Sequence, residues 1–333
     1  MKSDLLKIKD VLKKSSYVIA LFAILIITIL VFTLFNPLYI SPQNLVNVVE
    51  ETTINGILAI GVTFPIITGG IDLSVGSIMA VVDIVFGMMA VKGINPLLVI
   101  LGCIFLGYIM GALNGVVITQ MKLQPFIVTL SINSILRGIA YVISGGYPIL
   151  NIPQRFRNLL YENLGYGIRI SMLILFGVAL ICAFILKRTP AGTYIYALGS
   201  NEEATRLSGV NTSKYKIFAY IISGIAAALA GMIMVSRLGT GDPTTGVGYE
   251  LNAIAAAAIG GASLAGGKGS IAGTMIGALI LSALEAGLVL MGVNSFYQYI
   301  AIGLVIIIAT YVETIQNSIA SYISRHSKKR FSK

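Results

Sequence analysis

The stretch YVIALFAILIITILVFTLF, residues 17–35, decides the fold class of this chain. It is long enough to cross a bilayer, since about 20 consecutive apolar residues in a helix span the hydrocarbon core. It is also longer than the apolar core of a typical signal peptide, and the segment NPLYISP follows it in place of a small-residue cleavage site. We therefore expect a first membrane-spanning helix that stays in the protein.

The composition of the whole chain extends this expectation. Of its 333 residues, 11% are charged and 56% are hydrophobic, whereas charged residues make up about a quarter of an ordinary soluble domain. This excludes a soluble enzyme, a disordered chain and a disulfide-stapled secreted domain. The apolar runs are long and continuous, whereas the strands of a membrane β-barrel alternate over short segments. The expected fold is therefore all-α and polytopic.

The apolar runs predict about ten transmembrane helices in a single domain that covers residues 1–333. The predicted spans lie near residues 17–35, 53–69, 74–91, 96–118, 126–144, 170–187, 216–236, 251–265, 271–291 and 296–313. The second and the eighth are short enough to be broken or re-entrant.

Positively charged residues indicate the orientation. They gather in two tails, residues 1–16 and 314–333, and most of the others fall in segments that ten spans place on the same side. By the positive-inside rule that side is cytoplasmic. We expect a multi-pass protein of the cell membrane, surrounded by lipid, with both termini in the cytoplasm. The net charge of +10 does not indicate nucleic-acid binding, because the chain between the tails is too apolar to form a solvated basic face.

Few residues are suited to catalysis or metal binding. Cys103 and Cys182 lie within apolar runs and are expected to be buried free thiols, and the single histidine, His326, belongs to the second tail. We therefore expect no metal site and no covalent chemistry in this chain.

The longest internal segment predicted on the cytoplasmic side is RTPAGTYIYALGSNEEATRLSGVNTSKY, residues 188–215. Its opening at residues 190–192 indicates a helix stop or a turn. Asn201 is expected to cap a short helix that ends near Leu207, with Glu202 and Glu203 in the first turn. This segment is the best place for a soluble partner to bind.

Two glycine-rich segments resemble each other: ITGGIDLSVGSIM at residues 67–79 and IGGASLAGGKGSIAG at residues 259–273. Aligning Gly69 and Gly70 with Gly260 and Gly261 predicts a duplicated structural device. Clustered glycine allows turns and broken helices at membrane depth; close helix packing through small residues is the alternative. The second segment is not a nucleotide-binding P-loop, because it lacks the first glycine and the final serine or threonine of that motif.

Four ionisable residues lie in or beside the predicted spans, namely Asp72, Asp83, Arg137 and Glu285. A charge at membrane depth is costly unless it is paired or hydrated. We expect Asp83 or Glu285 to neutralise Arg137 in a salt bridge. Asp72 either caps the next helix or lines a transport pathway. A proton relay through these carboxylates is the alternative.

Four motifs carry a resemblance to a known family. They are ITGGIDLSVGS at 67–77, GTYIYALGSNEEATRLSGVNTSKYKI at 192–217, GYELNAIAAAAIGGASLAGGKGSIAGTMIGALIL at 248–281 and GVNSFYQYI at 292–300. Together they resemble the permease subunit of bacterial ABC sugar importers, in the ribose, xylose and galactoside branch. The resemblance covers nearly the whole chain.

This resemblance implies a heteromeric importer that moves a monosaccharide, with D-ribose as the expected sugar, into the cytoplasm by alternating access. It implies a cytoplasmic ABC ATPase that holds ATP and Mg, an extracytoplasmic sugar-binding protein, and a second permease copy that is identical or related. This chain would then be a permease and not an enzyme, and it would bind no cofactor of its own. The alternatives are a proton- or ion-coupled secondary sugar transporter that uses the intramembrane charges, and a channel.

The expected site residues form two groups. By the resemblance, the ATPase-coupling loop includes Gly192, Asn201, Glu202, Glu203, Ala204, Arg206 and Gly209. Gate or pathway candidates are glycine, small polar and aromatic residues, namely Gly69, Gly70, Asp72, Asn55, Asn114, Asn133, Tyr249 and Asn252. A sugar requires a hydrated or hydroxyl-matching passage, although hydrogen bonds between packed helices are an alternative role for each of these side chains.

Overall fold

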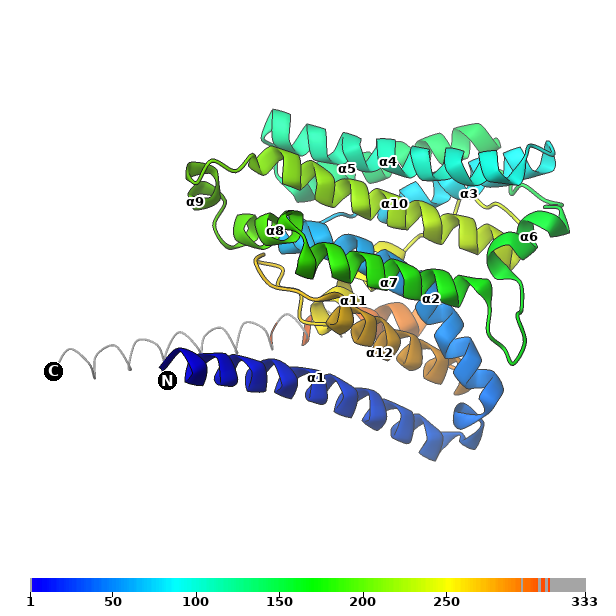
Figure 1. Ribbon diagram of the computed structural model, residues 1–333. Helices are drawn as coiled ribbons and strands as arrows, with labels where there is room; N and C mark the ends of the chain where they lie inside the picture. Colours follow the sequence, from blue (N-terminus) through cyan, green and yellow to red (C-terminus); the bar gives the residue numbers. More distant parts are fainter. Residues whose placement is uncertain (1, 295, 305–306, 309–310, 312–333) are drawn as a thin grey trace.

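The computed structural model describes residues 2–294, 296–304, 307–308 and 311 (Figure 1). The basic tail expected at 314–333 lies outside the described residues, as does part of the tenth predicted span. Within the described part, helices account for nearly all regular structure. Their bounds are α1 Lys2–Phe35, the 3₁₀ helix η1 Pro37–Ile40, α2 Pro42–Ile67, α3 Val75–Val91, α4 Pro96–Met121, α5 Pro125–Ser144, α6 Gln154–Tyr161, α7 Ile170–Arg188, α8 Pro190–Ser200, α9 Glu202–Leu207, α10 Thr212–Leu238, α11 Tyr249–Ile259 and α12 Ile271–Leu290.

Seven of these helices are long and apolar enough to cross a membrane: α1, α2, α4, α5, α7, α10 and α12. Two shorter apolar helices, α3 and α11, occupy the positions of the third and eighth predicted spans. Residues 296–304 are helical where the tenth span is expected. The prediction of an all-α polytopic membrane protein is confirmed.

The second span differs from its prediction. α2 has 26 residues and begins at Pro42, well before the predicted start at residue 53. Its outer part carries charges that the sequence analysis read as lying outside the membrane, but each is paired: Glu50 with Arg169, and Glu51 with Arg237. The eighth span is short, as predicted, because α11 has 11 residues; the third, α3, is also short, with 17.

Two central helices, α2 and α10, hold the bundle together. α10 packs against α4, α2 and α3, and α12 packs against α2 and α11. Small residues allow these close contacts: a Cβ at Gly111 of α4 would lie 2.3 Å from the carbonyl oxygen of Tyr220 on α10. Close packing through small residues therefore does occur, at glycines within the helices.

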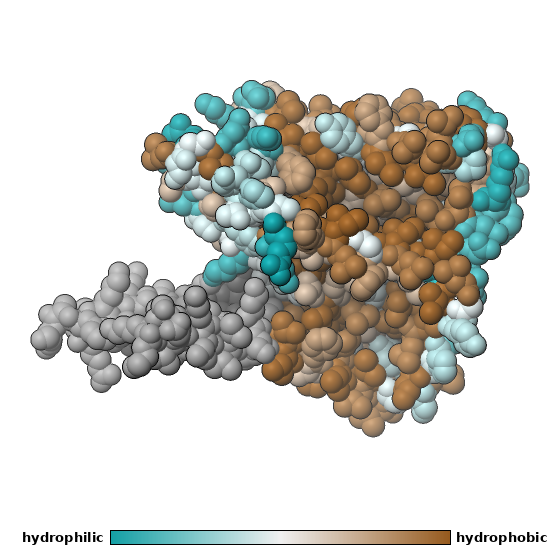
Figure 2. Space-filling model, in the orientation of Figure 1, coloured by the Kyte–Doolittle hydropathy of each residue, from teal (hydrophilic) through white to brown (hydrophobic). Residues whose placement is uncertain are grey.

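The flanks of the bundle are apolar. Large side chains such as Ile27, Leu101, Phe105 and Leu180 are exposed on α1, α4 and α7. Figure 2 shows a broad hydrophobic surface across the middle of the molecule, with hydrophilic residues at the two ends, where α9 and α6 lie. Exposed apolar surface of this extent requires a bilayer around it.

The segment between α7 and α10 confirms one local prediction and corrects another. α9 follows Asn201, whose Oδ1 accepts a hydrogen bond from the backbone N–H of Ala204 at 2.9 Å, as predicted for a capped helix. The helix stop predicted at residues 190–192 is present, since α7 ends at Arg188, but these residues then open a further helix where a loop was expected. Pro190 is the first residue of α8, where its fixed φ suits a helix and its missing N–H is not needed.

Candidate functional site

The two glycine-rich segments form the same turn. After α2, the N–H groups of Gly69 and Gly70 bond to carbonyls three and five residues back; after α11, those of Gly261 and Ala262 do the same. Gly69 and Gly261 have φ values of +81° and +86°, which side chains disfavour. In this turn Gly69 corresponds to Gly261 and not to Gly260. The same turn also follows Ala90, Val142, Arg206 and Val289 in the described residues, so the duplication of the two segments stays a prediction.

The two turns pack against each other at the end of α8. The N–H of Gly267 donates to the carbonyl of Ile67 at 2.8 Å. A Cβ at Gly199 of α8 would lie 2.5 Å from the nitrogen of Gly267. The hydroxyl of Tyr196, also on α8, donates to the carbonyl of Gly269 at 2.8 Å. Three backbone segments far apart in the chain thus meet without intervening side chains.

α9 projects from the same end of the bundle (Figure 1). Glu203 and Arg206 are exposed and paired at 2.6 Å, and the ammonium group of Lys216 lies 2.7 Å from Glu202. The hydrogen bond from Arg206 lowers the pKa of Glu203. Asn201 and Ala204 are also exposed. This short helix presents both charge signs to its surroundings.

The two glycines of the predicted coupling loop have different positions. Gly209 is exposed and has a φ of +84° in the turn before α10. Gly192 is buried, and a Cβ there would lie 2.3 Å from the carbonyl oxygen of Leu186. Gly192 therefore allows α8 to pack closely against the end of α7, and it does not reach the surface.

Asp72 lies in the buried break between α2 and α3. Its Oδ1 accepts hydrogen bonds from the N–H of Ser74 at 3.0 Å and from the Ser74 hydroxyl at 2.6 Å. The amide of Asn114 on α4 donates to that same hydroxyl at 2.7 Å. Ser74 itself is the N-cap residue of α3, so Asp72 supports the start of α3 through Ser74. Asp72 and Asn114 are fully buried in this network.

The predicted salt bridge of Arg137 with Asp83 or Glu285 is wrong. Arg137 donates through Nη1 to the carbonyls of Pro243 and Thr245, each at 2.7 Å. Asp83 accepts from the backbone N–H of Asp242 at 2.7 Å. The reason is the irregular segment 239–248, which runs along α3 and α5 and supplies backbone partners to both charges.

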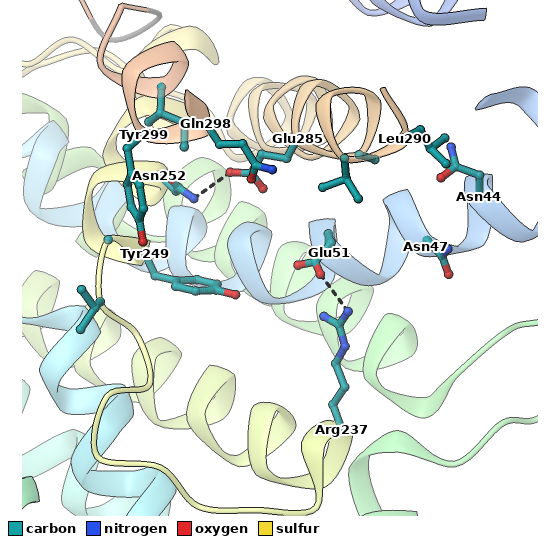
Figure 3. Close-up of a pocket in the computed structure, with 15 residues that line it drawn as sticks. Asn44, Asn47, Glu51, Arg237, Tyr249, Asn252, Glu285, Leu290, Gln298 and Tyr299 are labelled. Atoms are coloured by element: carbon teal, nitrogen blue, oxygen red, sulfur yellow. Dashed lines mark hydrogen bonds and ion pairs between the residues drawn. The ribbon is translucent and has the colours of Figure 1, made fainter. Parts of the chain in front are cut away.

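A polar cavity of about 530 Å³ lies towards the end of the bundle opposite α9 (Figure 3). α2, α10, α11, α12 and the helical residues 296–304 surround it. Its polar lining consists of Asn44, Asn47, Glu51, Arg237, Tyr249, Asn252, Glu285, Gln298 and Tyr299. Two pairs within it are visible in Figure 3: Arg237 with Glu51 at 2.8 Å, and the Asn252 amide with the Glu285 carboxylate at 2.9 Å.

Three predicted residues meet in this cavity: Tyr249, Asn252 and Glu285. Asn55, one helical turn after Glu51 on α2, is buried close to Glu285. Of the other pathway candidates, Asn133 is half-buried on α5 and Gly69, Gly70, Asp72 and Asn114 lie at the break after α2. The predicted pathway residues therefore do not form one site. Some lie at the cavity, others lie at the break after α2, and Asn133 lies apart on α5.

Six polar residues of the cavity lining are absent from the predicted site, namely Asn44, Asn47, Glu51, Arg237, Gln298 and Tyr299. A signal was present, because Asn44, Asn47 and Glu51 recur at spacings of three and four residues and so share one face of α2. The predicted start of the second span at residue 53 concealed this polar face. Arg237 could be placed beside Glu51 only by the packing of α10 on α2.

An apolar-flanked bundle of this kind defines a multi-pass membrane protein, and broken helices beside a polar cavity are typical of transporters. The comparisons with known proteins agree. Residues 44–310 match the family described as the branched-chain amino acid transport system / permease component. The chain belongs to this family.

Curated relatives resemble the chain over most of its length. A ribose import permease of Haemophilus influenzae is 44% identical over 86% of this chain and 90% of its own. A ribose import permease of Bacillus subtilis is 41% identical over 87% of this chain and 90% of its own. A D-allose permease of Escherichia coli is 36% identical over 86% of this chain and 89% of its own. No solved structure matches the chain.

Proposed function

We propose that this chain is the membrane-spanning subunit of an ABC importer that carries D-ribose into a bacterial cell. The observation that carries the proposal is the identity of 41–44% with ribose import permeases over nearly the full length of both chains. Relatives named for D-allose, xylose and fructose are 33–36% identical, which favours ribose among these sugars.

The importer contains further subunits under this proposal. A cytoplasmic ABC ATPase binds ATP and Mg, an extracytoplasmic binding protein delivers the sugar, and a second permease copy, identical or related, completes the transport unit. The distribution of basic residues supports a cell-membrane location with both termini in the cytoplasm. In that orientation α9 faces the cytoplasm and the polar cavity faces outward.

α9 is the element that contacts the ATPase. Its exposed Glu202, Glu203 and Arg206 offer charged hydrogen bonds to a soluble partner. Asn201 alone separates α9 from α8, so a displacement of α9 moves Gly199 and Tyr196. These two residues contact both glycine turns, and the turns join α2 to α3 and α11 to α12.

ATP acts on the permease through these contacts. Binding of ATP closes the ATPase pair and displaces α9, and α8 transmits the displacement to the broken helices. The ATPase shifts the equilibrium between the outward-open and inward-open states of the permease only by as much as its contacts with α9 differ in free energy between these two states. Because the backbone at the α8 junction is packed without side chains between the segments, it transmits small displacements efficiently.

A secondary transporter is not favoured. The relay predicted from the sequence would join Asp83, Arg137 and Glu285, yet Asp83 and Arg137 bond to the backbone of segment 239–248 and neither bonds to Glu285.

Uptake into proteoliposomes tests the proposal. The permease is reconstituted with its ATPase and binding protein, radiolabelled ribose is added, and ATP and Mg are supplied either inside or outside the vesicles. We expect uptake only when ATP is on the side of the membrane that carries the ATPase and the binding protein is on the opposite side. Uptake that follows a proton gradient without ATP would overturn the proposal, as would ATP-driven transport of another sugar with ribose excluded.

A further inference from the structure

The cavity of Figure 3 contains two carboxylates in different situations. Glu51 is paired with the guanidinium of Arg237 at 2.8 Å. Glu285 is bonded to an uncharged amide, since Asn252 donates to its Oε1 at 2.9 Å. Glu285 therefore keeps acceptor capacity that Arg237 does not use, since a carboxylate accepts about four hydrogen bonds.

The rest of the lining offers both donors and acceptors. The side-chain amides of Asn44, Asn47, Asn252 and Gln298 each carry an acceptor oxygen and two donor hydrogens. A metal cation requires a shell of acceptors, whereas a sugar hydroxyl both donates and accepts. This mixed lining matches a neutral polyhydroxylated molecule better than it matches an ion.

Two aromatic rings complete the lining. Tyr249 and Tyr299 lie beside Asn252 in Figure 3. An aromatic face packs against apolar C–H groups, while the phenol hydroxyl at its edge remains free to hydrogen-bond. A pyranose or furanose ring presents C–H groups and hydroxyls on different sides. The volume of about 530 Å³ lies within the range of small-molecule pockets and leaves room for water around one monosaccharide.

We propose that this cavity is a monosaccharide-binding site, in which the Glu285 carboxylate accepts hydrogen bonds from two sugar hydroxyls, Asn252 orients that carboxylate, and Tyr249 and Tyr299 pack against the sugar ring. The site receives sugar on its outward side before the helices rearrange. The Glu51–Arg237 pair forms the opposite wall and holds α2 to α10. This inference rests on the proposed function, which makes the transported molecule a sugar.

Tryptophan fluorescence provides a direct test, because the chain contains no tryptophan. The variant Tyr299→Trp adds one reporter per permease chain to the cavity, and ribose is titrated onto the complete permease–ATPase complex in detergent. The same titration of the complex without this substitution gives the emission of the ATPase, which is subtracted. We expect a saturable change in emission. Adding Glu285→Gln preserves the shape of the side chain but removes the charge that strengthens its hydrogen bonds, so the Kd for ribose should rise about tenfold.

The matched control is Glu162→Gln in the same reporter background, since Glu162 is exposed at the end of α6 and outside the cavity lining. This variant should leave the Kd unchanged. An equal Kd for the Glu285→Gln and Glu162→Gln reporters would overturn the site, and so would an emission change that follows sodium or protons instead of ribose. Both outcomes are compatible with ATP-driven ribose uptake by the unmodified importer, so failure of the site is distinguishable from failure of the proposed function.

Discussion

The Cα of Gly199 lies directly against the carbonyl oxygen of Ile67, so close that a Cβ on residue 199 would fall 1.7 Å from this oxygen. Gly199 is near the end of α8, and Ile67 is the last residue of α2. α8, the helix that precedes α9, therefore packs directly against the end of the central helix α2.

Replacing Gly199 with alanine should weaken the packing of α8 against the end of α2. The added methyl group cannot be accommodated without moving one backbone away from the other, which costs about 2 kcal/mol. We expect lower thermal stability of the detergent-solubilised permease and about tenfold slower ATP-driven ribose uptake. Gly177→Ala on α7 is the matched control, because a Cβ there meets nothing within 4 Å. Equal stability and uptake of the two variants would contradict the prediction.

The hydrogen bond of Tyr196 to Gly269 offers a milder change at the same junction. Tyr196→Phe removes the hydroxyl and leaves the carbonyl of Gly269 without this donor, at an expected cost of about 1 kcal/mol. ATPase association through α9 should persist, while the amount of ribose imported per ATP hydrolysed should fall. The two rates are measured in the same proteoliposomes. An unchanged ratio would show that this contact does not transmit the displacement.

Charge reversal on α9 tests docking of the ATPase. We expect Glu202→Lys, Glu203→Lys and Arg206→Glu together to reduce copurification of the ATPase without unfolding the bundle, because all three side chains are exposed. The Glu203–Arg206 pair itself is present at neutral pH and is lost only as the pH falls through the lowered pKa of Glu203. Because Glu203 stays ionised at every pH between 6 and 8, association should not change with pH in this range through loss of the pair. Normal copurification and uptake in the triple variant would refute the docking role.

Arg137 should act as an anchor for the irregular segment 239–248. Arg137→Gln frees the carbonyls of Pro243 and Thr245, so amide hydrogen exchange in this segment should accelerate and uptake should fall. Arg137→Lys, which keeps one charged donor, should show a smaller effect. If Arg137 were instead paired with Glu285 or Asp83, adding Glu285→Gln or Asp83→Asn would relieve the defect of Arg137→Gln. We expect no such relief.

The pair between Glu51 and Arg237 should stabilise the packing of α10 on α2. Both side chains are about two-thirds buried or more, so Glu51→Gln leaves a poorly hydrated cation and should cost about 2 kcal/mol. A double-mutant cycle with Arg237→Gln, read from unfolding of the solubilised protein, measures the coupling. Additive effects of the two substitutions would show that the pair contributes nothing beyond its members.

Much of the fold could be predicted from local sequence. Continuous apolar runs predicted the membrane helices, because hydrocarbon leaves the backbone no hydrogen-bond partners outside a helix. Asn201 with Glu202 and Glu203 predicted α9, because capping is an interaction between near neighbours. The repeated glycine segments predicted matching turns for the same reason, with an error of one residue in their alignment.

The partners of the buried charges could not be predicted in this way. Arg137 and Asp83 bond to the backbone of a segment more than 100 residues away, and a backbone carbonyl has no signature in the sequence. The outer half of α2 was misplaced for a related reason. Glu50 and Glu51 resemble exposed charges until Arg169 and Arg237 are known to lie beside them.

By itself, the sequence determined that this chain is a helical membrane protein, which side its basic residues favour and where its helices break, since hydropathy, charge and glycine act through local chemistry. Only the tertiary structure decided which polar groups share a cavity and which backbones touch at Gly199. Those relationships depend on how helices distant in the chain pack together. Each such contact depends on the shape and the hydrogen-bonding groups of both packed surfaces, whereas a sequence pattern describes only one of the two surfaces.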